Sequence, residues 1–151
     1  MAEAQAKVGT IVDPYRNYNF LMKIHDIAEA RFTECFGLDV DIPVITYHES
    51  GSGSTVRTIP GPVRYGVVTL RYGLTKPTVE LWNWLMLSAK GTVQRRHVTI
   101  ATLDPDGVTE VIHHSLVNAW PCGWSGVPFN ALGREIAIEE MRLAFDSLER
   151  S

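Results

Sequence analysis

The stretch from residue 66 to residue 91, GVVTLRYGLTKPTVELWNWLMLSAKG, places a strand, a turn and a helix in immediate succession. Its first part is apolar and β-branched, a composition typical of a buried strand. Leu81, Trp84 and Leu85 then recur at the three-to-four spacing that puts side chains on one face of a helix. We therefore predict one α-helix over about residues 77–90, the clearest helix in the chain.

Alternating apolar residues predict strands in most of the remaining sequence. Residues 18–24 alternate Tyr, Phe, Met and Ile with mostly polar residues, which is typical of a half-buried strand. The other predicted strands are residues 30–36, 40–48, 95–103 and 108–120. The turn sequence DPDG joins the last two as a hairpin. Many strands beside one strong helix predict a mainly β domain, either a sandwich or a small barrel.

Two segments predict irregular structure. Gly- and Ser-rich sequence follows residue 48, and little that could pack precedes residue 64. We predict one long exposed loop over residues 49–64, a length typical of functional loops. Residues 121–128, PCGWSGVP, predict an irregular corner after the hairpin.

The segment of residues 134–148 fits two structures. Its helix-forming residues and heptad-like apolar spacing favour a helix by local propensity. A strand would place Ile136 and Ile138 on one face but Met141 and Leu143 on the other. Such a strand requires a bulge or burial on both faces. The residues alone leave both structures open.

Length and charge limit the classes of protein. The 151 residues predict a single domain over residues 13–151, preceded by a polar N-terminal arm of residues 1–12. The net charge is −3, whereas a nucleic-acid-binding protein normally carries a stripe of basic residues. No run approaches the ~18 apolar residues of a membrane span, and the N-terminus lacks the apolar core of a signal peptide. We therefore expect assembly in the cytoplasm, without specific nucleic-acid binding or membrane insertion.

No residue pattern predicts a catalytic, cofactor or metal site. The residues weighed for such a role are His25, Asp26, His113, His114, Cys122, Glu139 and Glu140. Adjacent residues on a strand point to opposite faces, so neither the histidine pair nor the glutamate pair can share a site. The His-Asp pair fits a tight turn, and the cysteine has no sequence signature of a neighbouring base. We expect no enzyme activity and no cofactor.

The helix and the strand after it contain candidate interface residues. Trp82 and Trp84 lie two positions apart, about 200° around the predicted helix, so only one can face the core. An exposed tryptophan is unusual unless a neighbouring molecule covers it. Arg95 and Arg96 fit an intersubunit ion pair as well as a phosphate contact. These features predict homo-oligomerisation.

Several motifs together resemble the contractile-tail inner tube proteins. They are DPYRNYNFLMKI from residue 13, TVRTIPGPVRYGVVTLRYGLT from residue 55, ELWNWL from residue 80, LVNAWPCGWSG from residue 116 and NALGREIAIEEMRLAFDSLE from residue 130. This family includes the tail tube proteins of contractile-tailed phages and the tube proteins of extracellular contractile injection systems. The haemolysin-coregulated protein of type VI secretion is a more distant relative. The resemblance covers residues 13–149.

The resemblance implies two packed antiparallel sheets in a barrel-like sandwich with one flanking helix, and a strand over residues 134–146. It implies hexameric rings that stack into a hollow tube, which sheath contraction drives into a target. The implied partners are further copies of the chain, sheath and baseplate proteins, and a payload in the lumen. The implied location is a phage-tail-like particle, extracellular or part of a virion after release.

Two sets of contact residues follow. The loop after the third strand reaches the next ring in this family, so the candidate ring-stacking residues are Glu49, Ser50, Gly51, Ser52, Gly53, Ser54 and Thr55. The candidate subunit-interface residues are Trp82, Arg95, Arg96, Met141 and Leu143. The alternative functions are a specialised tube-end subunit that joins the tube to the baseplate and, from another class, a small-ligand-binding β-barrel or an enzyme. A binding barrel is expected to gather polar groups in one large pocket.

Overall fold

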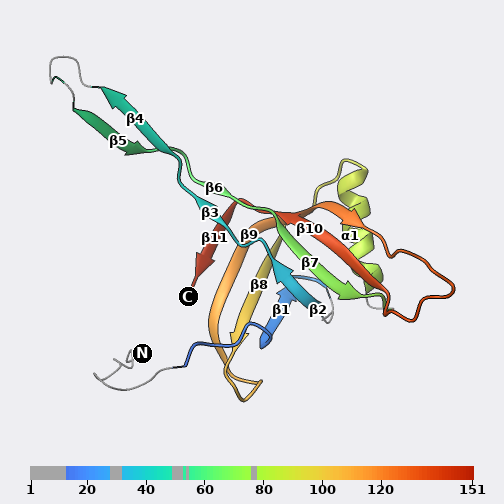
Figure 1. Cartoon of the computed structure of the whole chain (residues 1–151). Helices are drawn as coiled ribbons and strands as arrows, with labels where there is room; N and C mark the ends of the chain where they lie inside the picture. Colours follow the sequence, from blue (N-terminus) through green and yellow to red (C-terminus); the bar gives the residue numbers. More distant parts are fainter. Residues whose placement is uncertain (1–12, 28–31, 49–52, 54, 76–77) are drawn as a thin grey trace.

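The computed structural model describes residues 13–27, 32–48, 53, 55–75 and 78–151. Within these residues the elements in chain order are β1 (Phe20–Ile24), β2 (Phe32–Phe36), β3 (Val40–Asp41), β4 (Val44–His48), β5 (Val56–Pro60), β6 (Arg64–Tyr65), β7 (Val68–Gly73), α1 (Val79–Ala89), β8 (Arg96–Leu103), β9 (Glu110–Ser125), β10 (Ile138–Ala144) and β11 (Ser147–Arg150). The chain is thus mainly β with one helix, as the sequence predicts (Figure 1).

Two antiparallel sheets form the body of the molecule, and the long strand β9 belongs to both. The first part of β9 pairs with β8 and β11, and β8 pairs with β1; we call these strands the first sheet. The last part of β9 pairs with β10, which leads to β7 and β2; these form the second sheet. In the described chain this strand path runs from β1 to β2 without closing, so the body is a sandwich.

The core lies between the two sheets and follows from the alternation of side chains along each strand. Val68, Leu70 and Tyr72 of β7 are buried, whereas the residues between them are half-buried. Met141 and Leu143 of β10 pair with Leu70 and Val68 and are fully buried beside them. The first sheet and the helix contribute Met22, Ile24, Val98, Ile100, Leu116, Leu81 and Trp84.

Helix α1 packs against this core through one face, as its sequence pattern predicts. Trp84 is 1% exposed, and its Nε1 donates a hydrogen bond to the Gln94 carbonyl oxygen at 2.7 Å. The Arg96 guanidinium lies 5.3 Å from the centre of the same ring. Gly91 ends the helix with φ of 90°, a conformation that favours glycine. The prediction of a helix at about residues 77–90 is confirmed.

The ambiguous segment of residues 134–148 forms strand rather than helix, but only over β10 and the start of β11. The implied strand over residues 134–146 is therefore shorter than expected, because residues 134–137 precede β10. β10 buries Met141 and Leu143, and the register against β9 shifts at Arg142/Leu143. The bulge therefore lies on β9, where Gly123 and Pro121 oppose consecutive residues of β10. Ile136 lies before the strand and is exposed, so it does not interrupt the alternation.

Two predictions of irregular structure are wrong. The predicted corner at residues 121–128 is largely strand, because β9 continues to Ser125 through its pairing with β10. The predicted loop at residues 49–64 contains β5, which pairs with β4 along five positions, and the first of the two residues of β6, which pairs with β3. The predicted strand over residues 40–48 is interrupted at Ile42 and Pro43, where the proline favours an interruption.

The strands from β3 to β6, described over residues 40–48, 53 and 55–65, form a projection that we call the hairpin arm. Figure 1 shows it extending away from the sandwich as a continuation of the connection between β2 and β7. At its base, the Gly66 amide donates a hydrogen bond to the Asp39 carbonyl oxygen at 3.0 Å. The chain enters the hairpin arm after β2 and leaves it before β7, so two connections attach the arm to the second sheet.

Gly37, which connects β2 to the hairpin arm, is expected to tolerate no side chain. Its φ is +95°, and an added Cβ would overlap the Val67 carbonyl oxygen. We expect Gly37→Ala to lower the free energy of unfolding by about 1–3 kcal/mol, since it combines a strained φ with a backbone clash. Gly73→Ala is the control, because no atom lies within 4 Å of its added Cβ. Urea unfolding measures both, and equal stability of the two variants would contradict the expectation.

Candidate assembly surfaces

The hairpin arm is exposed along its whole paired length and carries apolar side chains on both of its sides. Every residue of β4 and β5 is exposed. Ile45 pairs with Ile59 on one side, and Val44 pairs with Pro60 on the other. The exposed fractions are 44% for each isoleucine and 71% for the valine. A two-stranded hairpin is at best marginally stable in water, so this surface is suited to contact with another molecule.

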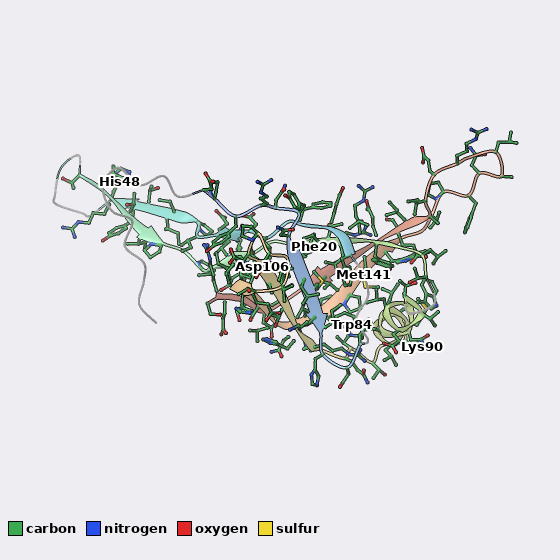
Figure 2. The ribbon with its side chains drawn as sticks, turned by 90° about the horizontal axis from the view of Figure 1, so that it is seen from below. Phe20, His48, Trp84, Lys90, Asp106 and Met141 are labelled. Atoms are coloured by element: carbon green, nitrogen blue, oxygen red, sulfur yellow. The ribbon has the colours of Figure 1, made fainter. Side chains whose placement is uncertain are left out.

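A second apolar surface lies in the connection from β9 to β10. We call residues 126–137 the end loop. Phe129, Leu132 and Ile136 are 89%, 92% and 81% exposed, the highest values among the large apolar side chains of the described chain. Figures 1 and 2 both show the end loop at the opposite end of the molecule from the hairpin arm. This surface was not predicted from the sequence, although three apolar residues in a Gly-, Pro- and Asn-containing segment were the available signal.

The end loop also borders a hollow of about 500 Å³. Its lining residues are Arg71, Val127, Pro128, Phe129, Asn130, Gly133, Arg134, Glu135, Ile136, Ala137 and Ile138. The polar members of this set come mainly from the loop itself. The hollow thus lies between the loop and the second sheet, and it combines apolar walls with charged groups at residues 134 and 135.

The outer face of the second sheet is polar, and its arginines have partners within the chain. Arg71 of β7 lies between two glutamates: its Nη1 is 3.2 Å from Glu34 and its Nε is 3.0 Å from Glu140. Arg142 donates a hydrogen bond to the Ser125 hydroxyl at 3.2 Å. These groups are partly solvated, so the pairs contribute little to stability. A face that satisfies its own charges can border water without a protein partner.

The two helix tryptophans differ as the sequence predicts. Trp84 is in the core, whereas Trp82 is 40% exposed. The Trp82 ring packs edge-on against Trp124 of β9, with ring centres 4.9 Å apart. Val79, one turn earlier, is 56% exposed. The outer side of α1 is therefore a third partly apolar surface.

The remaining interface candidates separate into two groups. Arg95 lies 3.5 Å from Asp146 in the same chain, and Arg96 covers Trp84. Met141 and Leu143 are 0% exposed, so their side chains belong to this chain's own core and offer no surface to a neighbour. Their selection as interface residues is corrected: the alternation of β10 directs both of them inward.

The tip of the hairpin arm is described only in part. Of the candidate ring-stacking residues, Glu49, Ser50, Gly51, Ser52 and Ser54 lie outside the described residues. Gly53 and Thr55 are described and exposed. The described surface nearest to this set is therefore the β4–β5 pair.

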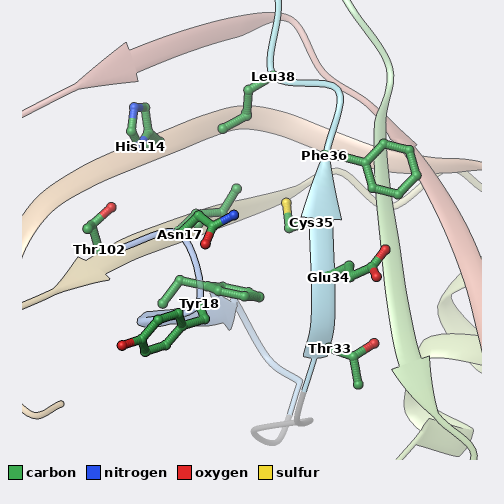
Figure 3. Close-up of a pocket in the computed structure, with 11 residues that line it drawn as sticks. Asn17, Tyr18, Thr33, Glu34, Cys35, Phe36, Leu38, Thr102 and His114 are labelled. Carbon is green, nitrogen blue, oxygen red and sulfur yellow. The ribbon is translucent and has the colours of Figure 1, made fainter. Parts of the chain in front are cut away.

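A groove of about 460 Å³ lies where the sandwich is open, between β1 and β2 (Figure 3). Its lining residues are Asn17, Tyr18, Phe20, Thr33, Glu34, Cys35, Phe36, Leu38, Ile100, Thr102 and His114. In Figure 3 the side chains of Cys35, Leu38 and His114 point toward the groove. Burial and the nearby Arg150 charge lower the pKa of His114, which keeps its imidazole neutral at pH 7. The neighbouring His113 instead contacts Glu110 at 3.4 Å, so the two histidines do not share a site.

The two cysteines are expected to differ in reactivity. Cys35 is half-buried, and burial raises its pKa to about 12, which leaves about one thiolate in ten thousand at pH 8. Cys122 is exposed; partial burial raises its pKa, and the Arg142 charge opposes that rise. We expect iodoacetamide at pH 8 to alkylate Cys122 first, as followed by peptide mass spectrometry of the native monomer. Faster modification of Cys35 would contradict the burial of its thiol.

Neither a metal cluster nor a membrane-spanning helix is found in the described chain. Residues 13–27, 32–48, 53, 55–75 and 78–151 contain no group of three or more His, Cys, Asp or Glu side chains placed to hold a metal ion. No helix in these ranges is both long and apolar enough to cross a bilayer.

Known proteins resemble the chain in sequence and in fold. The family described as T4-like virus tail tube protein gp19 matches residues 16–149. No curated protein matches. Among solved structures, a chain of the PVC sheath–tube complex of an extracellular contractile injection system, in the extended state, is 25% identical. Its TM-score is 0.81, and the match covers 91% of each chain.

Two further structures extend this comparison. A chain from the PVC sheath/tube terminator in the extended state is 25% identical with a TM-score of 0.84, over 94% of this chain and 99% of that one. Hcp1 from Flavobacterium johnsoniae is 13% identical with a TM-score of 0.54, over 87% of this chain and 93% of that one. At that identity the likeness to Hcp1 is one of fold alone.

Proposed function

Because the chain belongs to the T4-like virus tail tube protein family, which matches residues 16–149, we propose that it is the inner tube subunit of a contractile injection system. In this proposal six copies form a ring, rings stack into a hollow tube, and contraction of a surrounding sheath drives the tube into a target. The role is structural and requires no catalytic residue. The observation that carries the proposal is the match over almost the whole domain to tail tube proteins.

The exposed surfaces support assembly with further copies of the chain. A ring forms when two different surfaces of one subunit meet in a heterologous contact that closes, and stacking requires a further contact along the axis. The hairpin arm, the end loop and the outer side of α1 supply separate apolar surfaces for such contacts. The candidate interface residues that remain on the surface are Trp82, Arg95 and Arg96, together with Gly53 and Thr55 beside the arm tip.

The proposed partners outside the tube are a sheath and a baseplate. The likeness to a chain of a PVC sheath–tube complex supports a tube within a sheath. Assembly takes place in the cytoplasm, and the particle acts outside the cell or as part of a virion. A payload passes through the lumen, and the self-compensated charges of the second sheet suit a face that borders water.

The experiment that tests this function is negative-stain electron microscopy of the purified protein, with its mass in solution measured alongside. Six-fold rings or hollow tubes are the expected result. A uniform monomer at all concentrations, also in the presence of its own baseplate proteins, would overturn the proposal.

A second candidate is a subunit at the end of the tube. The likeness to a chain from the PVC sheath/tube terminator, with a TM-score of 0.84, favours it. A tube-end subunit should form rings that do not extend, because one of its axial surfaces contacts a different protein. Single rings at high protein concentration would support the tube-end role, and long tubes would support the main-tube role.

A further inference from the structure

We propose that the end loop (residues 126–137) of one copy is the acceptor for the hairpin arm of the next copy along the tube axis. This inference rests on the proposed tube function and adds to it the identity of the surface that the hairpin arm binds. Both surfaces belong to the same chain, and the large apolar side chains of each are exposed in a single copy.

The arm side of the contact is a double-sided apolar ribbon. Ile45, Ile59 and Tyr47 point to one side of the β4–β5 pair, because paired and alternate residues share a face. Val44 and Val56 lie on the other side. All five are between 38% and 71% exposed. A partner that covers one or both sides would bury apolar area that this chain leaves in water.

The acceptor side is the exposed tip of the end loop and the hollow beneath it. Phe129, Leu132 and Ile136 are more than four-fifths exposed. Phe129 and Ile136 also line the hollow of about 500 Å³, whose other side is the end of the second sheet. Protruding apolar side chains next to a concave surface can receive the flat face of a two-stranded hairpin, while Arg134 and Glu135 supply a polar rim.

The placement of the two surfaces requires that any contact between them joins different copies. The hairpin arm and the end loop lie at opposite ends of the molecule in the two views given by Figures 1 and 2. They cannot meet within one copy. When surfaces at opposite ends of one body bind each other, each copy repeats the contact with the next, and the series closes into a ring or stays open according to the rotation between copies. The proposed axial contact corresponds to the open series, which is what stacking along a tube requires.

Mixed cross-linking tests this contact. The background is Cys35→Ala with Cys122→Ser, which removes the two native thiols. Ile45→Cys places a thiol on the arm, and Leu132→Cys places one on the end loop of an isotope-labelled pool. After the two pools are mixed and assembled, a short bismaleimide should give dimers that contain one chain from each pool. The double variant Ile45→Cys/Leu132→Cys should give a ladder of products that extends beyond six chains, because an axial contact does not close. A ladder that ends at six chains would place the contact within a ring and overturn the inference.

The control pair is Ile45→Cys with Val108→Cys, since Val108 is 80% exposed and lies in the turn between β8 and β9. This pair should cross-link at least tenfold less than the arm–loop pair. If tubes form by electron microscopy but the arm–loop pair cross-links no better than the control, the inference is overturned and the tube function stands. If Ile45→Cys alone gives dimers at the same yield, the arm binds another arm, and the inference is also overturned. Absence of rings and tubes from the wild-type chain at all concentrations, also in the presence of its own baseplate proteins, overturns the proposed function and this contact together.

Discussion

Replacing Trp84 with alanine is expected to lower the free energy of unfolding by about 3–5 kcal/mol. The side chain is 1% exposed and is among the largest in the core. Its removal leaves a cavity that the surrounding strands cannot fill, and it also removes the hydrogen bond from Nε1 to the Gln94 carbonyl oxygen. The Arg96 guanidinium loses the ring that it covers. Urea unfolding followed by circular dichroism measures the loss.

Trp82→Ala is the matched control, because it removes the same side chain from the same helix two positions earlier. Trp82 is 40% exposed and contacts Trp124 edge-on, so we expect the free energy of unfolding to fall by only about 1 kcal/mol. Its main expected effect is on assembly, measured as the protein concentration at which rings or tubes appear. Equal losses of stability in the two variants would refute the assignment of the two tryptophans to different faces.

Replacing Ile45 and Ile59 together with serine is expected to abolish tube formation and to leave the fold intact. The two side chains form a cross-strand pair on one side of the hairpin arm and are each 44% exposed. Each is expected to contribute about 1–2 kcal/mol when buried in a contact between copies. Their joint loss therefore weakens each contact by about 30- to 1,000-fold. Electron microscopy and sedimentation measure tubes, and the melting temperature reports the fold.

Val108→Ser provides the comparison for this experiment. Val108 is an exposed apolar residue in the β8–β9 turn, away from the hairpin arm. We expect this variant to form tubes at the wild-type protein concentration. Normal tubes from the Ile45→Ser/Ile59→Ser variant would show that the arm is dispensable for stacking. A large drop in its melting temperature would instead show that the arm supports the sandwich.

The strand and helix patterns were predictable where one face of an element is buried in the same chain. The β7–α1 stretch shows this: Val68 and Leu70 alternate in a strand, and Leu81 and Trp84 follow the helical period. The core supplies a physical reason for each pattern, since a shift of one residue would move apolar side chains into water.

The hairpin arm could not be predicted in this way, because neither of its sides is buried in the chain. Its apolar residues show no single face, and the composition of residues 49–54 favours a loop. The pairing of β4 with β5 joins two separate segments of the chain, and local propensity does not predict such pairing. The end loop could not be predicted from the period of its apolar residues, because Phe129, Leu132 and Ile136 have the three-to-four spacing of a helix although the segment contains no helix.

The sequence by itself determined the mainly β class, the position of the helix and the division of Trp82 and Trp84 between surface and core. These depend on side-chain period and composition, which are properties of the chain alone. Only the tertiary structure decided that β9 runs through both sheets, that Met141 and Leu143 point inward, and that two apolar surfaces lie at opposite ends. Those features depend on which strands pair and in which register, and pairing between distant segments is settled by packing of the whole chain.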